Sequence, residues 1–178
     1  MKSEKVKILL DADVVIHFIK GGCLSLLPDI LPAYQFAILD IVLDRELRRH
    51  PQTCTQLNNH IRILKNIEVI GWNPNYEMIY EYNMLIKTLG VGESASMVYC
   101  KYHPNVLASS NLCDIKSYCE QNRITYLSTM DLLYLACHRK VMTEQACDRF
   151  IADVLRQGSK LPVSKLSLYM PRAEVFSL

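Results

Sequence analysis

The sequence predicts an α/β fold, a three-layer α/β/α arrangement in which helices cover both faces of a mainly parallel central sheet. Short apolar runs alternate along most of the chain with longer segments whose apolar residues recur at helical spacing. The first run, Val6–Leu10, is short and almost continuously apolar, as expected for a strand buried on both faces. Strands that alternate with helices in this way favour a parallel sheet between two helical layers.

Length and composition indicate one domain with a sizeable apolar core. The chain has 178 residues, of which 50% are hydrophobic and 21% are charged, and a domain of this size buries roughly 70% of its unfolded surface. We expect a single domain over residues 1–178, with a core of about 5–140 and a C-terminal extension of about 141–178. The seven cysteines include no CxxC pair, which predicts reduced thiols rather than disulfides or a zinc cluster.

The sequence predicts neither a membrane span nor a secretory signal. The longest strongly apolar uncharged run, Ile30–Leu39, is too short to cross a bilayer and contains Pro32 and Gln35. The first apolar stretch is too short for the core of a signal peptide and lacks a small-residue cleavage site. We therefore expect a cytoplasmic protein with no membrane partner.

In the first half of the chain, we expect strands at 6–10, 34–39 and 67–70. The helices are expected at 12–20, 24–31, 42–50, 53–65 and 75–89. Gly21 and Gly22 end the first helix, Pro51 stops the third, and the Gly90-Val91-Gly92 segment breaks the last.

In the second half, we expect strands at 106–108 and 124–127. Helices are expected at 93–102, from the fourth strand to 120, at 131–140, and from 143 to 158. Thr143 is the predicted N-cap of the last helix and Gly158 its end. The tail, residues 161–178, fits either a final strand or an arm over the surface.

Two carboxylates follow the first strand directly. Asp11 and Asp13 stand at its carboxyl end, where ligand sites lie in parallel α/β sheets. An ordinary structural explanation competes with a site, because Asp is a good helix N-cap and a favourable first-turn charge.

Glu46 shares a helix face with Val42 and Leu43, the apolar side expected to face the sheet. A carboxylate on a buried face needs a partner. A metal ion, a basic side chain or a different helix phase would each explain it.

Two further acids begin helices beside strand ends. Glu93 follows Gly90-Val91-Gly92 and shares its helix side with apolar residues. Asp114 follows the fourth strand, and its spacing from Asn111 also fits a capping box with Asp in place of Glu.

Each acid has a structural explanation, but together they indicate a site. All five map near the carboxyl ends of strands, and clustered carboxylates repel one another unless a cation neutralises them. Oxygen ligands without His or Cys suit Mg²⁺ or Mn²⁺, which activate water and stabilise the charge of a phosphoryl displacement.

Four ordered segments of the chain resemble the PIN domain family. They are Ile8–Val14, Val42–Leu47, Leu89–Ala95 and Leu107–Asp114. Ser128-Thr129 falls where that family places a hydroxyl pair after its last core strand. The resemblance covers roughly residues 5–140, and the ordered set is more specific than any single motif.

The resemblance implies a metal-dependent ribonuclease fold, often dimeric, that binds Mg²⁺ or Mn²⁺. The implied acidic quartet of catalytic and metal-binding residues is Asp11, Glu46, Glu93 and Asp114. Asp13 would be auxiliary, and Thr129 or Asn111 would orient water or a ligand by hydrogen bonding. A homodimer is expected, and the sequence leaves open whether the protein is a toxin with an antitoxin partner.

The chain departs from the family pattern at one position. Many members have Asp near the position of Asn111, so either Asp114 alone supplies the fourth acid or the site is weakened. The second possibility predicts a PIN-like module that binds RNA or a protein without cutting it.

A phosphatase of the haloacid-dehalogenase type is a third possibility. That family also has a strand followed by DxD and a later strand ending in Ser or Thr, which Asp11-Ala12-Asp13 and Ser128-Thr129 would match. An acidic motif should then follow the hydroxyl motif, and Asp131 is the only nearby acid.

The net charge of +2 is too small to indicate a nucleic-acid partner by itself. If the five carboxylates surround a metal, however, 20 basic groups face 13 remaining acids, and RNA becomes the expected partner. The candidate phosphate contacts are Arg45, Arg48, Arg49, Lys116 and Arg139.

Overall fold

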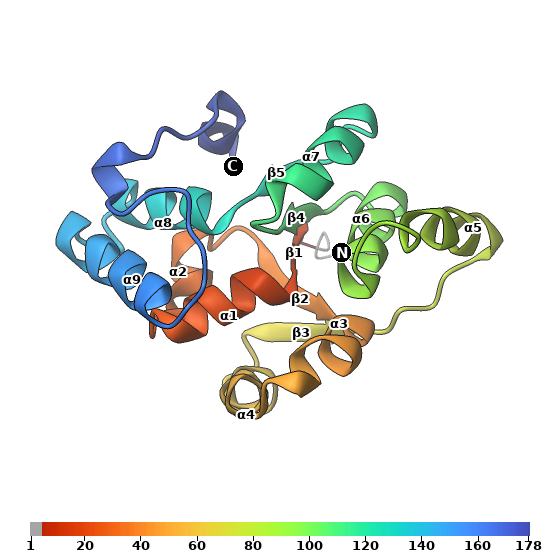
Figure 1. The fold of residues 1–178 in the computed structure, drawn as a ribbon, viewed down its shortest axis with the longest axis horizontal. Coiled ribbons are helices and arrows are strands. Elements are labelled where there is room, and N and C mark those ends of the chain that lie inside the picture. The colour runs from red at the N-terminus through yellow and green to blue at the C-terminus, as the bar shows by residue number, and fades with distance from the viewer. Residues whose placement is uncertain (1–4) are drawn as a thin grey trace.

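The computed structural model describes residues 5–178 and contains a five-stranded sheet in the order β3-β2-β1-β4-β5 (Figure 1). The strands are β1 (Lys7–Leu10), β2 (Gln35–Leu39), β3 (Ile67–Ile70), β4 (Val106–Ala108) and β5 (Tyr126–Leu127). Every neighbouring pair is parallel. The predicted α/β fold with a parallel central sheet is therefore confirmed.

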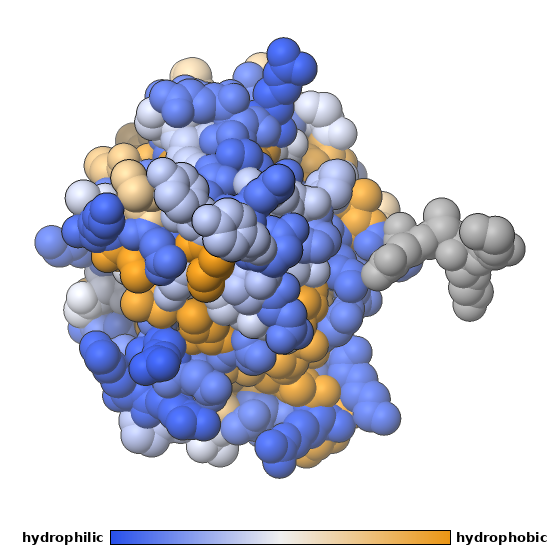
Figure 2. All heavy atoms as spheres, turned by 90° about the vertical axis from the view of Figure 1, so that its right-hand side faces the viewer, coloured by the Kyte–Doolittle hydropathy of each residue, from blue (hydrophilic) through white to orange (hydrophobic). Residues whose placement is uncertain are grey.

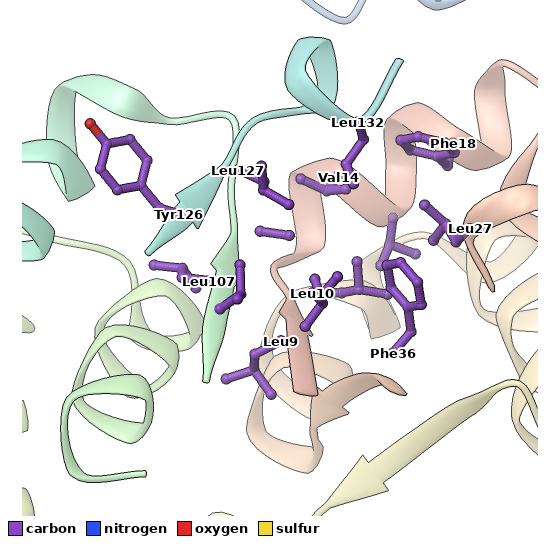
Figure 3. Packing of buried hydrophobic residues seen from close by; sticks show 14 of the residues in the cluster. Leu9, Leu10, Val14, Phe18, Leu27, Phe36, Leu107, Tyr126, Leu127 and Leu132 are labelled. Carbon is purple, nitrogen blue, oxygen red and sulfur yellow. The ribbon is translucent and has the colours of Figure 1, made fainter. Parts of the chain in front are cut away.

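The middle strand, β1, is the most deeply buried. Ile8, Leu9 and Leu10 have no exposed surface, because β1 pairs with β2 on one side and with β4 on the other. Figure 3 shows Leu9 and Leu10 among apolar side chains from the neighbouring strands and from α1 (Ala12–Lys20), α2 (Leu27–Ile30) and α8 (Thr129–His138). This position explains why the strand is apolar without alternation.

One face of the sheet is covered by α1, α2, α8 and α9 (Glu144–Arg156). The Phe18 and Phe150 rings of α1 and α9 meet edge to face, with centroids 5.1 Å apart. Gly21 follows α1, and a Cβ at this position would overlap the Phe150 ring. Glycine thus lets α9 pack closely against the end of α1.

The other face is covered by α3 (Asp40–Arg45), α5 (Tyr76–Leu85), α6 (Val91–Tyr102) and α7 (Leu112–Gln121). Helix α6 is the central element of this layer, since it contacts α3, α5, α7 and three strands. Figure 2 looks onto the side that carries α5 and shows hydrophobic surface scattered among hydrophilic residues.

The predicted helix over 42–50 is shorter and begins earlier than expected. Helix α3 ends at Arg45, and a 3₁₀ turn, η2 (Leu47–Arg49), leads into α4 (Pro51–Asn58) and a π-helical turn, η3 (Asn59–Ile63). Glu46 is consequently the residue after the helix rather than a member of its buried face.

The tail adds no strand to the sheet in the described residues, so the arm is the correct alternative. It contains two 3₁₀ segments, η4 (Leu166–Leu168) and η5 (Ala173–Ser177), and passes over α8 (Figure 1). Tyr169 and Arg172 hold it to Asp131 of α8, at 2.6 and 3.2 Å. No helix in the described part of the chain is long and apolar enough to span a membrane.

Candidate acidic site at the carboxyl edge of the sheet

A cavity of about 430 Å³ opens at the carboxyl edge of the sheet. The strand order reverses direction between β1 and β4, the place where parallel α/β sheets form ligand sites. Its acidic lining residues are Asp11, Asp13, Glu46, Glu93 and Asp114. We call this cavity the acidic pocket. The structure thus brings together all five acids that the sequence singled out.

Asp11 is fixed between β1 and α1. Its backbone amide donates to the Ala108 carbonyl of β4 at 2.9 Å, and its Oδ1 accepts from the Ala12 amide at 2.9 Å. The side chain caps α1, as the structural explanation predicted. Burial, together with the charges of Asp13, Glu46 and Glu93, raises the pKa of Asp11 well above its ordinary value. Capping alone leaves this carboxyl group without a compensating positive charge.

Asp13 is held by one oxygen only. Its Oδ2 accepts a hydrogen bond from the Ser110 amide at 2.8 Å, whereas Oδ1 is buried and forms no hydrogen bond with any residue of 5–178. Burial raises the pKa of Asp13 to about 6, although the nearby backbone amides of Ser110, Val14 and Asn111 oppose the shift. A buried acceptor without a donor is costly, so Oδ1 is positioned to take a ligand.

Glu46 has a partner that the sequence did not reveal. Its Oε1 accepts from the Gly92 amide at 2.8 Å, in the first turn of α6. The helix N-cap, Gly90, has no side chain, so Glu46 supplies the cap from another element. A Cβ on Gly92 would lie 2.6 Å from Oε1. The absence of a side chain at Gly92 therefore lets the Glu46 carboxylate reach the backbone amide of α6.

Glu93 lies one residue further along α6 and is only 6% exposed. Burial is the main cause that raises its pKa to about 7, and the charges of Asp114, Asp13 and Glu46 add to it. The N-terminal turn of α6 thus contains Glu93 and also donates its Gly92 amide to the carboxylate of Glu46.

Asp114 and Asn111 do not form the predicted capping box. Asn111 makes no side-chain cap, and its Nδ2 instead donates to Asp114 Oδ2 at 2.6 Å. Both side chains are exposed at the mouth of the acidic pocket, where they could turn towards a ligand.

The donor chemistry of the pocket fits Mg²⁺ or Mn²⁺, because every acidic group supplies oxygen. The unpartnered Asp13 Oδ1 and the raised pKa values of Asp11 and Glu93 fit a cation as well. As the side chains stand, however, no three His, Cys, Asp or Glu residues within 5–178 group closely enough to hold a metal ion. Binding would therefore require side-chain movement.

Thr129 lies behind the acidic pocket rather than in its wall. It is fully buried, and its Oγ1 bonds to Ser110 Oγ at 2.7 Å and to His17 Nδ1 at 2.8 Å. Burial, and secondarily the charge of Lys20, lowers the pKa of His17 to about 4. Thr129 therefore supports the loop that binds Asp13. Ser110 is the residue of this loop whose amide holds Asp13, and the sequence did not indicate that role.

Of the candidate phosphate contacts, Arg49 lies in the pocket wall, next to His50. Arg45 and Arg48 are exposed nearby, and Arg48 pairs with Asp44 at 3.0 Å. Lys116 lies on α7 outside the pocket, 3.9 Å from Glu120.

Arg139 does not lie near the acidic pocket, contrary to expectation. Its guanidinium donates to the carbonyls of Ile30 and Leu178, both at 2.7 Å. Ile30 ends the helix before β2, so these bonds place Arg139 towards the opposite edge of the sheet. Its positive charge was the only feature that suggested a place near the site, and in the structure Arg139 holds the tail instead.

No protein-family model matches this chain, and a search of curated proteins also finds no match. The PIN resemblance, with the homodimer and the antitoxin partner that it raises, therefore stays a prediction.

Proposed function

We propose that this protein is a metal-dependent endoribonuclease that hydrolyses RNA phosphodiester bonds in the acidic pocket. The observation that carries the proposal is a set of buried acids without compensating charge at the switch point of the sheet. Burial raises the pKa of Asp11, Asp13 and Glu93, and Asp13 Oδ1 has no hydrogen-bond partner in the described part of the chain. A bound divalent cation would offset the cost of keeping these groups ionised.

In this proposal, Asp11, Asp13 and Glu93 would hold the ion, and Glu46 and Asp114 would complete the acidic wall. Bound Mg²⁺ or Mn²⁺ supplies an activated water and stabilises developing phosphoryl charge. Asp11 is fixed at both its backbone and its side chain, so it would be the central ligand.

RNA is the proposed substrate because basic groups border the acids. Arg49 and His50 line the same cavity as the carboxylates, and Arg45 is exposed nearby. A phosphodiester could thus contact cationic side chains while its reacting phosphorus lies over the acids.

A module that binds RNA without cutting it is the second candidate. It is favoured by the closed Asn111–Asp114 hydrogen bond, by the use of Glu46 as a helix cap, and by the lack of a preformed three-ligand group in the described residues. A phosphatase of the haloacid-dehalogenase type would need Asp131 as the acid that follows its hydroxyl motif. Asp131 instead bonds to Ser128, Tyr169 and Arg172.

The deciding experiment compares wild type with Asp11→Asn in Mn²⁺, using a mixed-sequence RNA. Asn keeps the size and the capping oxygen of Asp11 but removes its charge. We expect wild type to cleave RNA and to melt at higher temperature with Mn²⁺, because only the folded chain assembles the acids. Asp11→Asn should fold, lose cleavage and lose most of the Mn²⁺-induced shift.

The matched control is Asp29→Asn, which removes an exposed first-turn acid of α2 far from the cavity. It should retain both cleavage and the metal-induced shift. RNA binding without cleavage in wild type would favour the non-cutting module. If wild type shows no metal-induced shift and all three proteins melt alike, the acids are structural only.

A further inference from the structure

A second cavity lies beside the acidic pocket and is built largely by the tail. It measures about 350 Å³, within the range of about 300–1,000 Å³ of small-molecule sites. Its walls come from the start of α7, the turn before α8, and the chain after α9. We call it the tail pocket. Asn111 lines both cavities, so a ligand in one is adjacent to a ligand in the other.

The walls of the tail pocket are mainly apolar. Leu112, Met130 and Leu161 line it, together with Pro162 and Tyr169. The hydroxyl of Tyr169 already donates to Asp131 at 2.6 Å. Hydroxyl groups in this wall are thus engaged within the protein, and the cavity offers mostly apolar surface to a ligand.

Polar groups remain at the mouth of the tail pocket. Lys160 is exposed there and forms no hydrogen bond or ion pair with any residue of 5–178. Asn111 marks the boundary with the acids. A ligand would therefore meet an apolar interior, an amide on one side and a cation at the rim.

We propose that the tail pocket binds a nucleobase of the RNA strand, next to the phosphodiester held over the acids. This inference rests on the proposed function. An unstacked base has a flat apolar face and a hydrogen-bonding edge, and proteins read single-stranded RNA by enclosing such bases. Lys160 is placed to contact a phosphate of the same strand. The tail thereby helps select which phosphodiester reaches the acids.

The experiment uses a short single-stranded RNA with 4-thiouridine at one position, bound to the full chain in EDTA so that no cleavage occurs. After irradiation, mass spectrometry maps the crosslinked residues. We expect crosslinks at Cys113, Met130 or Tyr169, all of which line the tail pocket. Crosslinks confined to other parts of the surface would overturn the proposal.

Affinity measurements give an independent test. Leu161→Gln should weaken RNA binding by roughly tenfold, towards the lower end of the about five- to 150-fold that one base–aromatic stack contributes. Leu168→Gln, the same change at an exposed tail residue outside the cavity, should bind as wild type does. Removing the base at the crosslinked position should weaken wild type by a similar factor and have little further effect on Leu161→Gln.

Equal affinities of the two variants would overturn the base pocket. Mn²⁺-dependent cleavage by wild type, assayed in parallel, separates this outcome from failure of the nuclease proposal. If wild type binds no RNA, the base pocket is overturned as well, and the cleavage assay again reports on the nuclease independently. If Leu161→Gln does not fold, the crosslink map of wild type decides.

Discussion

Two groups of buried carboxylates lie at the carboxyl edge of the sheet, and the protein treats them differently. Asp131 is fully buried in α8, and its oxygens accept from the Ser128 amide and hydroxyl, from Tyr169 and from Arg172, at 2.6–3.2 Å. Asp11 is buried and Asp13 is half-buried, yet each carboxylate accepts one backbone hydrogen bond and neither forms an ion pair with a basic side chain of residues 5–178.

This difference separates a structural carboxylate from a candidate functional one. The chain supplies Asp131 with a capping box, a phenol and a guanidinium, and Arg172 in turn lies over the Tyr126 ring at 3.8 Å. In the acidic pocket, by contrast, the neighbours of each acid include other acids. A bound cation therefore stabilises the folded protein most where a buried carboxylate has no positive charge or donor from the chain to offset its own charge.

The largest expected effect is at Asp131. Asp131→Asn should destabilise the protein by about 3 kcal/mol, because it leaves Arg172 partly buried without its counter-charge. Asp148→Asn is the control, since Asp148 also holds the tail, through the Leu166 amide at 2.8 Å, and should cost only about 1 kcal/mol. Urea unfolding measures both. If Asp131→Asn lost less stability than Asp148→Asn, Asp131 would not be a strongly compensated structural carboxylate.

The second prediction concerns pH. Without metal, the pKa values of Asp13 and Glu93 are about 6 and about 7 in the folded protein, above their unfolded values near 4. The folded state therefore binds more protons than the unfolded state between about pH 4 and 7, and stability falls as pH rises through this window. The two shifts together correspond to about 6 kcal/mol, and the opposing shift of His17 reduces the net fall to about 3 kcal/mol.

His17 acts in the opposite direction over part of that window. Its pKa is lowered to about 4, so its contribution to stability is present above pH 6.5 and is lost as pH falls towards 4. The unfolding free energy in EDTA should thus decline throughout pH 5 to 8, and His17 makes the decline below pH 6.5 shallower than the two acids alone would. Mn²⁺ should remove the decline, and Asp13→Asn should reduce it. A metal-free protein that is equally stable at pH 6 and 8 would contradict the uncompensated acids.

The third prediction tests the support behind the pocket. Thr129→Val should cost about 1–2 kcal/mol, because it removes the hydroxyl that joins His17 to Ser110. Thr55→Val, which removes an exposed hydroxyl bonded to the Pro51 carbonyl, should cost less. If Thr129 instead touches substrate, as the resemblance implied, its variant would lose RNA cleavage at full stability.

The sequence was sufficient for the features that depend on local pattern. The apolar run Ile8–Leu10 predicted the central strand, and the acids after strand ends predicted the lining of the cavity. These predictions succeeded because parallel strands bring their carboxyl ends to one edge. The cap of α9 by Thr143 was likewise local, with Ala146 donating at 3.2 Å.

Features that depend on contacts between distant segments could not be predicted in this way. Glu46 bonds to Gly92, 46 residues away, and helical phase cannot reveal such a partner. Arg172 and Tyr169 reach Asp131 from a tail with no periodic pattern. The orientation of the acids relative to one another also depends on these contacts, so the sequence could not show that no three of them, within residues 5–178, group closely enough to hold a metal ion.

The smallest expected change in stability is at Gly92, where a substitution tests whether Glu46 is a structural or a functional carboxylate. In Gly92→Ala, the new Cβ would lie 2.6 Å from Glu46 Oε1, so the carboxylate must leave the helix amide. Loss of this hydrogen bond lowers the unfolding free energy by about 1 kcal/mol, and the higher helix propensity of alanine raises it by about 1 kcal/mol. We therefore expect unfolding free energy in EDTA to stay nearly unchanged.

The metal response of this variant distinguishes a structural Glu46 from a functional one. Once released from the cap, Glu46 is free to join Asp11 and Glu93, so the Mn²⁺-induced rise in melting temperature should increase. Gly90→Ala is the matched control, because its Cβ would meet Glu46 Oε1 at an ordinary 3.5 Å and its φ of −63° suits alanine. If the two variants respond to Mn²⁺ alike, Glu46 belongs with Asp131 among the carboxylates that serve the fold alone.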